Sequence, residues 1–283
     1  MPTFTGTPDN DVYGETGNSD TYDLLGGNDT VTVSVGTDTV NGGIGTDTLI
    51  ANYSAATGDI VSDGPRAGTS GEGFDGAYYQ SIGGNPAVTY SSIERFDITT
   101  GGGNDNIRTA SGDDIVRTGA GNDFVNFGSG SDSGDGGTDN DGFSADLSTY
   151  GSGVSFDLTS TGAQGGPGTI VNFEYLGILT TTGLADVVIT GAINENETVN
   201  LGGGDDRVTV AGGMDAVNGG IGTDTLVANY SAATGNIISD GPRASTSGEG
   251  FDGGYYQSVG SNPGVTFTSF ERFHITTGIG ADH

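Results

Sequence analysis

Acidic residues that recur every nine positions constrain this chain more than any other feature of its sequence. Glycines cluster before most of these acids, and an apolar side chain follows two positions later, as Leu49 follows Asp47. Glycine permits the positive φ angles of tight turns, and a strand points alternate side chains to one face. Each nonapeptide therefore predicts one turn and one short strand. The acids form three runs: Asp11, Asp20, Asp29, Asp38 and Asp47; Asp105, Asp114, Asp123, Asp132 and Asp141; and Glu197, Asp206, Asp215 and Asp224.

Two nonapeptides make one coil of 18 residues, and successive coils can stack as parallel strands about 4.8 Å apart. Asp29 is then expected to lie over Asp11 and beneath Asp47, while Asp20 and Asp38 share the opposite edge. The sequence thus predicts an all-β fold, a parallel β-solenoid of stacked turns. Helix signals are nearly absent.

Charge and composition limit the classes of binding partner that the chain could have. The 283 residues carry a formal net charge of −30 and 56 glycines, with no cysteine. Such acidity disfavours nucleic acid and anionic membranes, whose phosphates it would repel, and it favours a small hard cation with oxygen ligands. No apolar run is long enough to span a membrane, and the first residues do not resemble a secretory signal peptide. Composition alone also allows disorder, but the strict periodicity argues against it.

The nonapeptide resembles that of the RTX (hemolysin-type calcium-binding) family, G-G-x-G-x-D-x-U-x, whose fold is a Ca²⁺-binding parallel β-roll. Residues 42–50 and 219–227 match it most fully. The unit before Asp20 lacks the first glycine pair and the unit before Asp38 keeps only one glycine, so weak or absent binding is expected there. The resemblance implies that turn carbonyls join the acids as ligands. Those carbonyls belong to Gly27, Gly42, Gly43, Gly45, Gly121, Gly219, Gly220 and Gly222.

Stacked carboxylates and turn carbonyls together supply the six or more oxygens that Ca²⁺ accepts. Acids paired at 18 residues predict roughly eight ions, whose charge would offset about half of the negative charge. Without metal the stacked acids repel, so the arrays are expected to be disordered until Ca²⁺ binds. The alternative is that the aspartates only form side-chain turns, which require neither strict register nor a stacked partner.

A second repeat has a period of 177 residues: residues 41–100 return at 218–277 with mostly conservative changes. The organisation predicted is RTX arrays at 1–50, 100–144 and 182–227, with β-rich inserts at 51–99, 145–181 and 228–276. Residues 277–283 resemble the start of a further array, so the chain looks cut from a longer protein. The inserts are expected to prolong the solenoid with short strands and longer loops.

The first insert and its duplicate each contain a loop rich in tyrosine, at residues 63–79 and 240–256. These loops could bind a sugar or a further cation, or they could pack their own aromatic rings on the solenoid. Glu94-Arg95 and Glu271-Arg272 are interpreted as structural ion pairs. The possible ligand residues of the loops are Arg66, Glu72, Asp75, Tyr78 and Tyr79, with Arg243, Glu249, Asp252, Tyr255 and Tyr256 in the duplicate.

Catalysis is not expected, because there is no thiol nucleophile and the two histidines, His274 and His283, lie at a variable repeat position and at the end of the sequence. The leading hypothesis is a calcium-binding structural or adhesive module of a secreted bacterial protein. The RTX resemblance implies export by a type I system. The alternatives are a lectin-like module that binds cell-surface glycan or extracellular matrix, and the non-catalytic C-terminal region of an exported enzyme. Exposed strand edges at solenoid ends also predict end-to-end association.

Overall fold

Strands and turns account for the whole of the described chain. The computed structural model describes residues 1–69, 71–160, 162–191, 194–258 and 263–283, and no helix occurs in them. The strands form two compact units. The first comprises Met1–Gly142 with Ile170–Asn172, and the second Phe143–Thr169 with Phe173–His283. Among the described residues there is no helix of the length and apolarity needed to cross a membrane.

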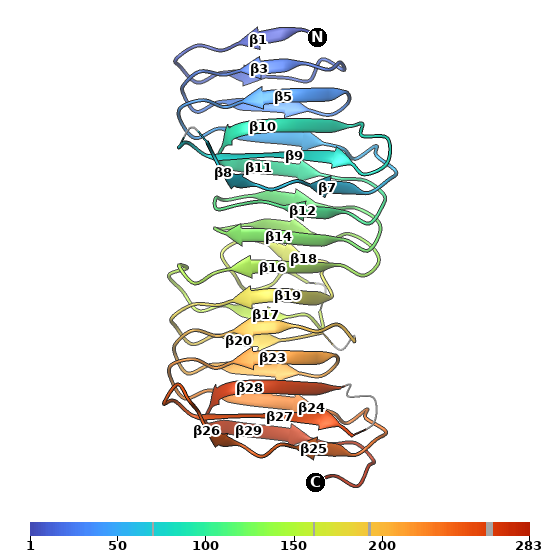
Figure 1. The fold of residues 1–283 in the computed structure, drawn as a ribbon, viewed down its shortest axis with the longest axis vertical. Coiled ribbons are helices and arrows are strands. Elements are labelled where there is room, and N and C mark those ends of the chain that lie inside the picture. Colours follow the sequence, from blue (N-terminus) through green and yellow to red (C-terminus); the bar gives the residue numbers. More distant parts are fainter. Residues whose placement is uncertain (70, 161, 192–193, 259–262) are drawn as a thin grey trace. The chain divides into compact units, whose positions relative to one another are not determined.

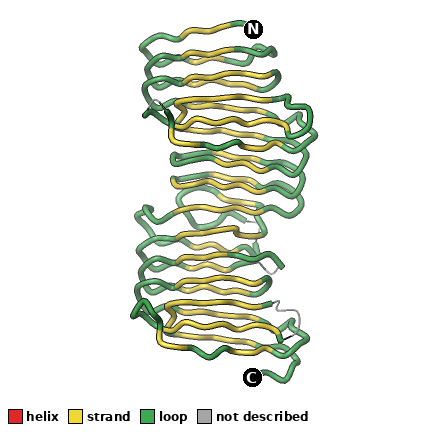
Figure 2. The backbone as a smooth tube through the Cα atoms, in the orientation of Figure 1, coloured by secondary structure: helices red, strands yellow, loops and turns green. Residues whose placement is uncertain are grey.

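The first unit has two sheets joined by turns (Figure 2). One sheet is parallel throughout, because each strand lies on the equivalent strand of the preceding coil. Val31, for example, pairs with Leu49, 18 residues later, as the stacking predicted. Its strands in spatial order are β2 (Val12–Tyr13), β4 (Thr30–Val33), β6 (Thr48–Asn52), β11 (Arg95–Thr99), β13 (Ile115–Arg117), β15 (Ser133–Asp135) and β18 (Ile170–Val171).

The other sheet of the first unit starts with parallel strands that lie one beneath another in Figure 1. The sheet departs from this pattern at β9 (Phe74–Gln80). This strand runs antiparallel between β10 (Ala87–Ile93) and β7 (Ile60–Ser62). The short strand β8 (Arg66–Ala67) pairs with the first two residues of β9, Phe74 and Asp75. The order is β1 (Thr3–Thr5), β3 (Thr21–Asp23), β5 (Thr37–Asn41), β10 (Ala87–Ile93), β9 (Phe74–Gln80), β7 (Ile60–Ser62), β12 (Asn106–Arg108) and β14 (Phe124–Ser129).

The second unit repeats this plan. One sheet is parallel, with the order β17 (Ser155–Asp157), β20 (Val187–Ile189), β22 (Arg207–Val210), β24 (Thr225–Asn229) and β29 (Arg272–Thr276). In the other sheet an antiparallel strand again enters through the insert. Its order is β16 (Gly142–Asp146), β19 (Tyr175–Thr180), β21 (Thr198–Asn200), β23 (Met214–Asn218), β28 (Gly264–Phe270), β27 (Phe251–Gln257) and β25 (Ile237–Ser239), with β26 (Arg243–Ala244) also beside β27.

The core of each unit lies between its two sheets. In the nonapeptide coils it consists mainly of small aliphatic side chains such as Val31, Val40 and Leu49, all fully buried. These alternate with outward Thr and Asn side chains, because successive residues of a strand face opposite sides. The prediction of an all-β fold with stacked parallel strands is confirmed. The sequence did not reveal the antiparallel strands β9 and β27.

Candidate metal centre

The acids of the nonapeptides form ladders along the edges of the coils. In each case the backbone N–H of one acid donates to a carboxylate oxygen of the acid 18 residues later, as from Asp29 to Oδ1 of Asp47 at 2.8 Å. The expected stacking of Asp29 over Asp11 and beneath Asp47 is therefore confirmed. The same bond joins Asp11 to Asp29, Asp20 to Asp38, Asp105 to Asp123, Asp114 to Asp132, Asp123 to Asp141, Glu197 to Asp215 and Asp206 to Asp224.

The second oxygen of most rungs has no hydrogen-bond donor, although it is buried. Asp47, for example, is 0% exposed and its Oδ2 has no partner. A buried, unpaired carboxylate costs several kcal/mol unless a proton or a cation neutralises it. A proton or a cation at each of these oxygens would remove this cost. The acids with such an Oδ2 are Asp29, Asp38, Asp47, Asp114, Asp123, Asp132, Asp206, Asp215 and Asp224.

Burial shifts the protonation of these acids strongly. Desolvation raises the pKa of Asp132 to about 8 and that of Asp206 to about 7, and neighbouring carboxylates add to the rise in both. The pKa of Asp38, Asp47 and Asp224 rises to about 6, again chiefly because burial penalises the charged form. A cation beside such an acid would favour the ionised form and lower its pKa again.

Glycines bring backbone carbonyls close to the same oxygens. Gly45 has φ +145°, and a Cβ on it would lie 1.7 Å from the carbonyl oxygen of Gly27 in the preceding coil. A Cβ on Gly42 would lie 2.6 Å from Oδ2 of Asp47. No side chain larger than glycine fits either position. Carbonyl and carboxylate oxygens therefore crowd the interior of each turn.

The other glycines predicted as carbonyl ligands all lie in such turns. A Cβ on Gly219 would lie 2.7 Å from Oδ2 of Asp224, which matches the geometry at Gly42 and Asp47. The remaining five have positive φ and stack against the backbone of a preceding turn: Gly27, Gly43, Gly121, Gly220 and Gly222.

Side chains alone do not complete a metal site. Within the described part of the chain, no group of three or more His, Asp or Glu side chains lies close enough to hold an ion. The carboxylates meet in pairs at most, so further ligands must be backbone carbonyls or water. Ca²⁺ accepts such a mixed oxygen set at about 2.3–2.6 Å. The donor chemistry thus fits Ca²⁺ and excludes a soft-metal site.

Threonine replaces glycine in several turns and changes the environment of the acid. The hydroxyl of Thr16 donates to Oδ2 of Asp20, and that of Thr100 donates to Oδ2 of Asp105. Thr7 bonds to Asp11 in the same way, at 3.1 Å. These acids have a protein donor for an oxygen that is bare in the glycine turns. At Asp20 the threonine occupies only Oδ2 and Oδ1 stays without a donor, as does Oδ2 of Asp38, the other degenerate unit. At Asp105 both oxygens have a donor, from Thr100 and from the N–H of Ile60, which gives a physical reason for weaker metal binding there.

Residues 192–193, shortly before Glu197, lie outside the described ranges. Glu197 is 1% exposed and lies in register with Asp215. Desolvation raises the pKa of both carboxyls, and the proximity of the Asp215 carboxylate raises that of Glu197 further.

A second ladder, which sequence reasoning missed, stands one residue before the acids. The side-chain oxygen of Asn10 accepts a bond from the N–H of Asn28, and Oδ1 of Asn28 accepts one from Thr46. Asn104, Asn122 and Asn140 repeat the pattern in the second array. The signal was present in the sequence as Asn or Asp at 18-residue spacing. This ladder fixes the turns independently of the acids.

The tyrosine-rich loops do not present the ligand surface that their composition suggested. Tyr78 is fully buried and stacks on Tyr90 at 5.3 Å between ring centroids. Its hydroxyl donates to the carbonyl of Arg108 at 2.7 Å. Tyr79 is 36% exposed, and Tyr255 and Tyr256 are partly buried. Tyr78 is therefore a core residue and is inaccessible to a sugar.

The polar loop residues are dispersed. Arg66 pairs with Asp63 at 2.6 Å in an exposed contact of little energetic value. Arg243, Glu72 and Glu249 are exposed. Asp75 and Asp252 are half-buried and accept hydrogen bonds from the N–H groups of Ser92 and Ser269.

The predicted ion pairs Glu94–Arg95 and Glu271–Arg272 are wrong, since neither occurs in the described structure. The strand register aligns Glu94 with Asp47, and its Oε2 accepts a bond from the N–H of Asp47 at 2.7 Å. Glu271 receives the same bond from Asp224. Because Arg95 and Arg272 are the next residues in the chain, they point to the opposite side of the sheet.

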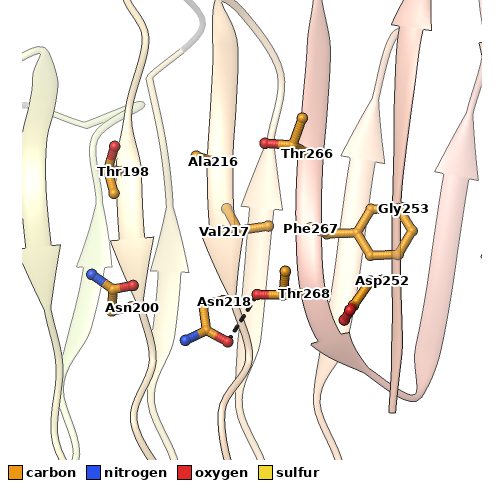
Figure 3. Close-up of a pocket in the computed structure, with 10 residues that line it drawn as sticks. All are labelled: Thr198, Asn200, Ala216, Val217, Asn218, Asp252, Gly253, Thr266, Phe267 and Thr268. Carbon is orange, nitrogen blue, oxygen red and sulfur yellow. Dashed lines mark hydrogen bonds between the residues drawn. The ribbon is translucent and has the colours of Figure 1, made fainter. Parts of the chain in front are cut away.

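An open hollow lies on the outer face of β21, β23 and β28 (Figure 3). Its floor consists of short polar side chains, among them Asn218, whose Oδ1 accepts a 3.0 Å bond from Thr268. Phe267 also borders it but is only 2% exposed. The hollow thus offers no exposed ring for stacking and no cluster of acids for a cation.

A family model described as "RTX calcium-binding nonapeptide repeat (4 copies)" matches residues 16–49, 99–134 and 193–226. These segments contain most of the ladder acids. No curated protein matches the chain.

Proposed function

Because residues 16–49, 99–134 and 193–226 are RTX calcium-binding nonapeptide repeats, we propose that this chain is a module whose arrays fold when they bind Ca²⁺. The observation that carries the proposal is the series of buried carboxylate oxygens without hydrogen-bond donors, repeated along the coil edges. Each would become a ligand of Ca²⁺, and the carbonyls of the adjoining glycine turns would complete the coordination.

The ligands proposed are the ladder acids together with the turn carbonyls of the glycines named above. Asp105, whose two oxygens already have donors, would bind more weakly than Asp47 or Asp224. Roughly eight ions, as the pairs of acids suggest, would have affinities of about 10⁻⁴–10⁻³ M, the range of extracellular calcium modules. Such affinities would leave the arrays empty where free Ca²⁺ is scarce.

Metal and fold are coupled in this proposal. A ligand that binds only the folded state stabilises it by mass action, and one site at 100 times its Kd contributes about 2.7 kcal/mol. Without Ca²⁺ the stacked acids carry much of the formal net charge of −30 into a narrow interior. The chain would then stay unfolded in a low-calcium cytoplasm and fold outside the cell. RTX repeats are typical of secreted bacterial proteins, and this supports a structural or adhesive role after type I export.

Circular dichroism tests the proposal directly. The full chain in EGTA should lack most β-sheet signal, and millimolar CaCl₂ should restore it. Equal concentrations of MgCl₂ should restore much less, because Mg²⁺ releases its water reluctantly and demands octahedral geometry. A spectrum that is the same with EGTA and with CaCl₂ would refute metal-coupled folding.

A further inference from the structure

Glu94 occupies a rung of the acid ladder although it lies outside the nonapeptides. The register of β11 on β6 pairs Arg95 with Thr48, which places Glu94 opposite Asp47. The N–H of Asp47 donates to Oε2 of Glu94 at 2.7 Å, just as the N–H of Asp29 donates to Oδ1 of Asp47 at 2.8 Å. The insert thus supplies the next carboxylate of the ladder after 47 residues instead of 18.

Two buried oxygens at this rung have no hydrogen-bond donor. They are Oδ2 of Asp47, on a side chain that is 0% exposed, and Oε1 of Glu94. The two oxygens belong to neighbouring rungs that the N–H bond from Asp47 to Glu94 joins, so one ion between the rungs would neutralise both. The pair is not explained by a salt bridge, because the described structure places no cationic side chain on either carboxylate.

The carbonyl of Ser92 approaches the same place. Ser92 has φ +51°, a conformation that non-glycine residues rarely adopt. Its carbonyl oxygen and Oδ2 of Asp47 lie 2.0 and 2.6 Å from the point that a Cβ on Gly42 would occupy. The separation of these two oxygens therefore does not exceed twice a Ca²⁺–O bond of about 2.3–2.6 Å. The N–H of Ser92 is held by Oδ1 of Asp75 at 3.2 Å, which secures this unusual turn.

The duplicate insert repeats this geometry in the second unit. The N–H of Asp224 donates to Oε2 of Glu271 at 2.7 Å. Ser269 has φ +57°, and its carbonyl oxygen and Oδ2 of Asp224 lie 2.1 and 2.7 Å from the Cβ position of Gly219. Asp252 accepts the N–H of Ser269 at 3.1 Å, as Asp75 accepts that of Ser92.

We propose that each of these two inserts closes its array with a hybrid Ca²⁺ site. One site would use the carboxylates of Asp47 and Glu94 and the carbonyl of Ser92, and the other the equivalent groups of Asp224, Glu271 and Ser269. The inference rests on the proposed function, because it extends calcium binding from the nonapeptides into the inserts. Its consequence is that the inserts are held to the arrays by shared ions as well as by strand pairing.

The test is to count bound Ca²⁺ in the full chain by equilibrium dialysis and elemental analysis. The measurement is made at the lowest free Ca²⁺ that saturates the wild-type chain. Glu94→Gln and Glu271→Gln keep an oxygen that can accept the N–H of the ladder but remove the negative charge. Each single variant should bind one ion fewer than the wild type, and the double variant two fewer.

Asp63→Asn with Asp240→Asn is the matched control, because it removes two exposed charges from the same inserts. This control should bind as many ions as the wild type. An unchanged ion count in the double glutamine variant would overturn the hybrid sites while leaving the array sites intact. A wild-type chain that binds no Ca²⁺ would overturn the proposed function as well. If the double variant fails to regain its dichroism in Ca²⁺, the single variants decide, because each leaves the site of the other unit unaltered.

Discussion

The nonapeptide coils and the insert coils build the same two sheets around different interiors. An array coil encloses small aliphatic side chains such as Val31 and Leu49 together with buried acids. An insert coil encloses Tyr78, Tyr90 and Phe96, whose ring centroids lie 5.1–5.9 Å apart. Aromatic side chains bury about 150–250 Å² each and contribute far more hydrophobic free energy than valine. We therefore expect the metal dependence of folding to be concentrated in the arrays.

Removal of calcium should therefore destabilise the array coils much more than the insert coils, and this is the largest effect expected. At 10 times its Kd one site contributes about 1.4 kcal/mol, so roughly eight sites together match the usual stability of a domain, about 5–15 kcal/mol. In hydrogen exchange without Ca²⁺, β4 and β6 should lose protection, whereas β9 and β10 around Tyr78 should keep part of it. Simultaneous loss of protection in arrays and inserts would show instead that the two form one cooperative element.

Truncation of the buried Tyr78 ring should destabilise the insert more than truncation of the neighbouring Tyr79 ring. Tyr78→Ala empties a fully buried site and removes the hydrogen bond to Arg108, so it should cost about 3–5 kcal/mol in urea unfolding with Ca²⁺ present. Tyr79→Ala, at a site that is 36% exposed, should cost less than about 1 kcal/mol. Equal losses for the two variants would contradict the assignment of Tyr78 to the core.

A methyl group added to a glycine turn tests how closely the turns of the array stack. Gly45→Ala forces a Cβ against the carbonyl of Gly27 at positive φ and should cost about 2–3 kcal/mol in the same urea assay. Gly102→Ala is the matched control, since a Cβ there meets nothing within 4 Å and its φ is not positive. It should be nearly neutral. A tolerated Gly45→Ala would mean that the turns stack less closely than described.

Acidification should partly substitute for calcium, which is the smallest effect expected. Desolvation raises the pKa of Asp132 to about 8 and that of Asp206 to about 7, above the value of about 3.9 for an unfolded chain. Between these values the folded state binds more protons than the unfolded state. The calcium-free fold should therefore gain stability as pH falls from 8 towards 4 and lose it as pH rises.

This pH dependence is read from the β-sheet signal of the calcium-free chain, and only the arrays should respond. With Ca²⁺ present the direction reverses, because protons compete for the same carboxylates and weaken binding at low pH. Calcium-free arrays that are most stable at pH 8 would contradict the unpaired buried acids.

The array was predictable from the sequence because its information is local. Asp29 and Asp47 stand 18 residues apart, so that periodicity alone placed one above the other. Glu94 reaches the same ladder from 47 residues away, through two strands of the insert, and no short period shows this. The sequence left Tyr78 open between a ligand residue and a ring packed on the solenoid, because its loop is rich in glycine and polar residues. Within β9 Tyr78 is buried while the next residue, Tyr79, is exposed. Where pairing is non-local or antiparallel, the repeat carried no signal.

The most direct measurement is anomalous diffraction from crystals of the full chain grown in CaCl₂. If the arrays bind Ca²⁺, we expect peaks between the stacked turns. Each peak should lie about 2.3–2.6 Å from a carboxylate oxygen that has no protein donor, such as Oδ2 of Asp47 or Asp224. Peaks should be weaker or missing beside Asp105, whose two oxygens already accept bonds from Thr100 and from the N–H of Ile60. A well-ordered solenoid with no anomalous peak in its turns, and with water or a protein donor on those oxygens, would contradict the account.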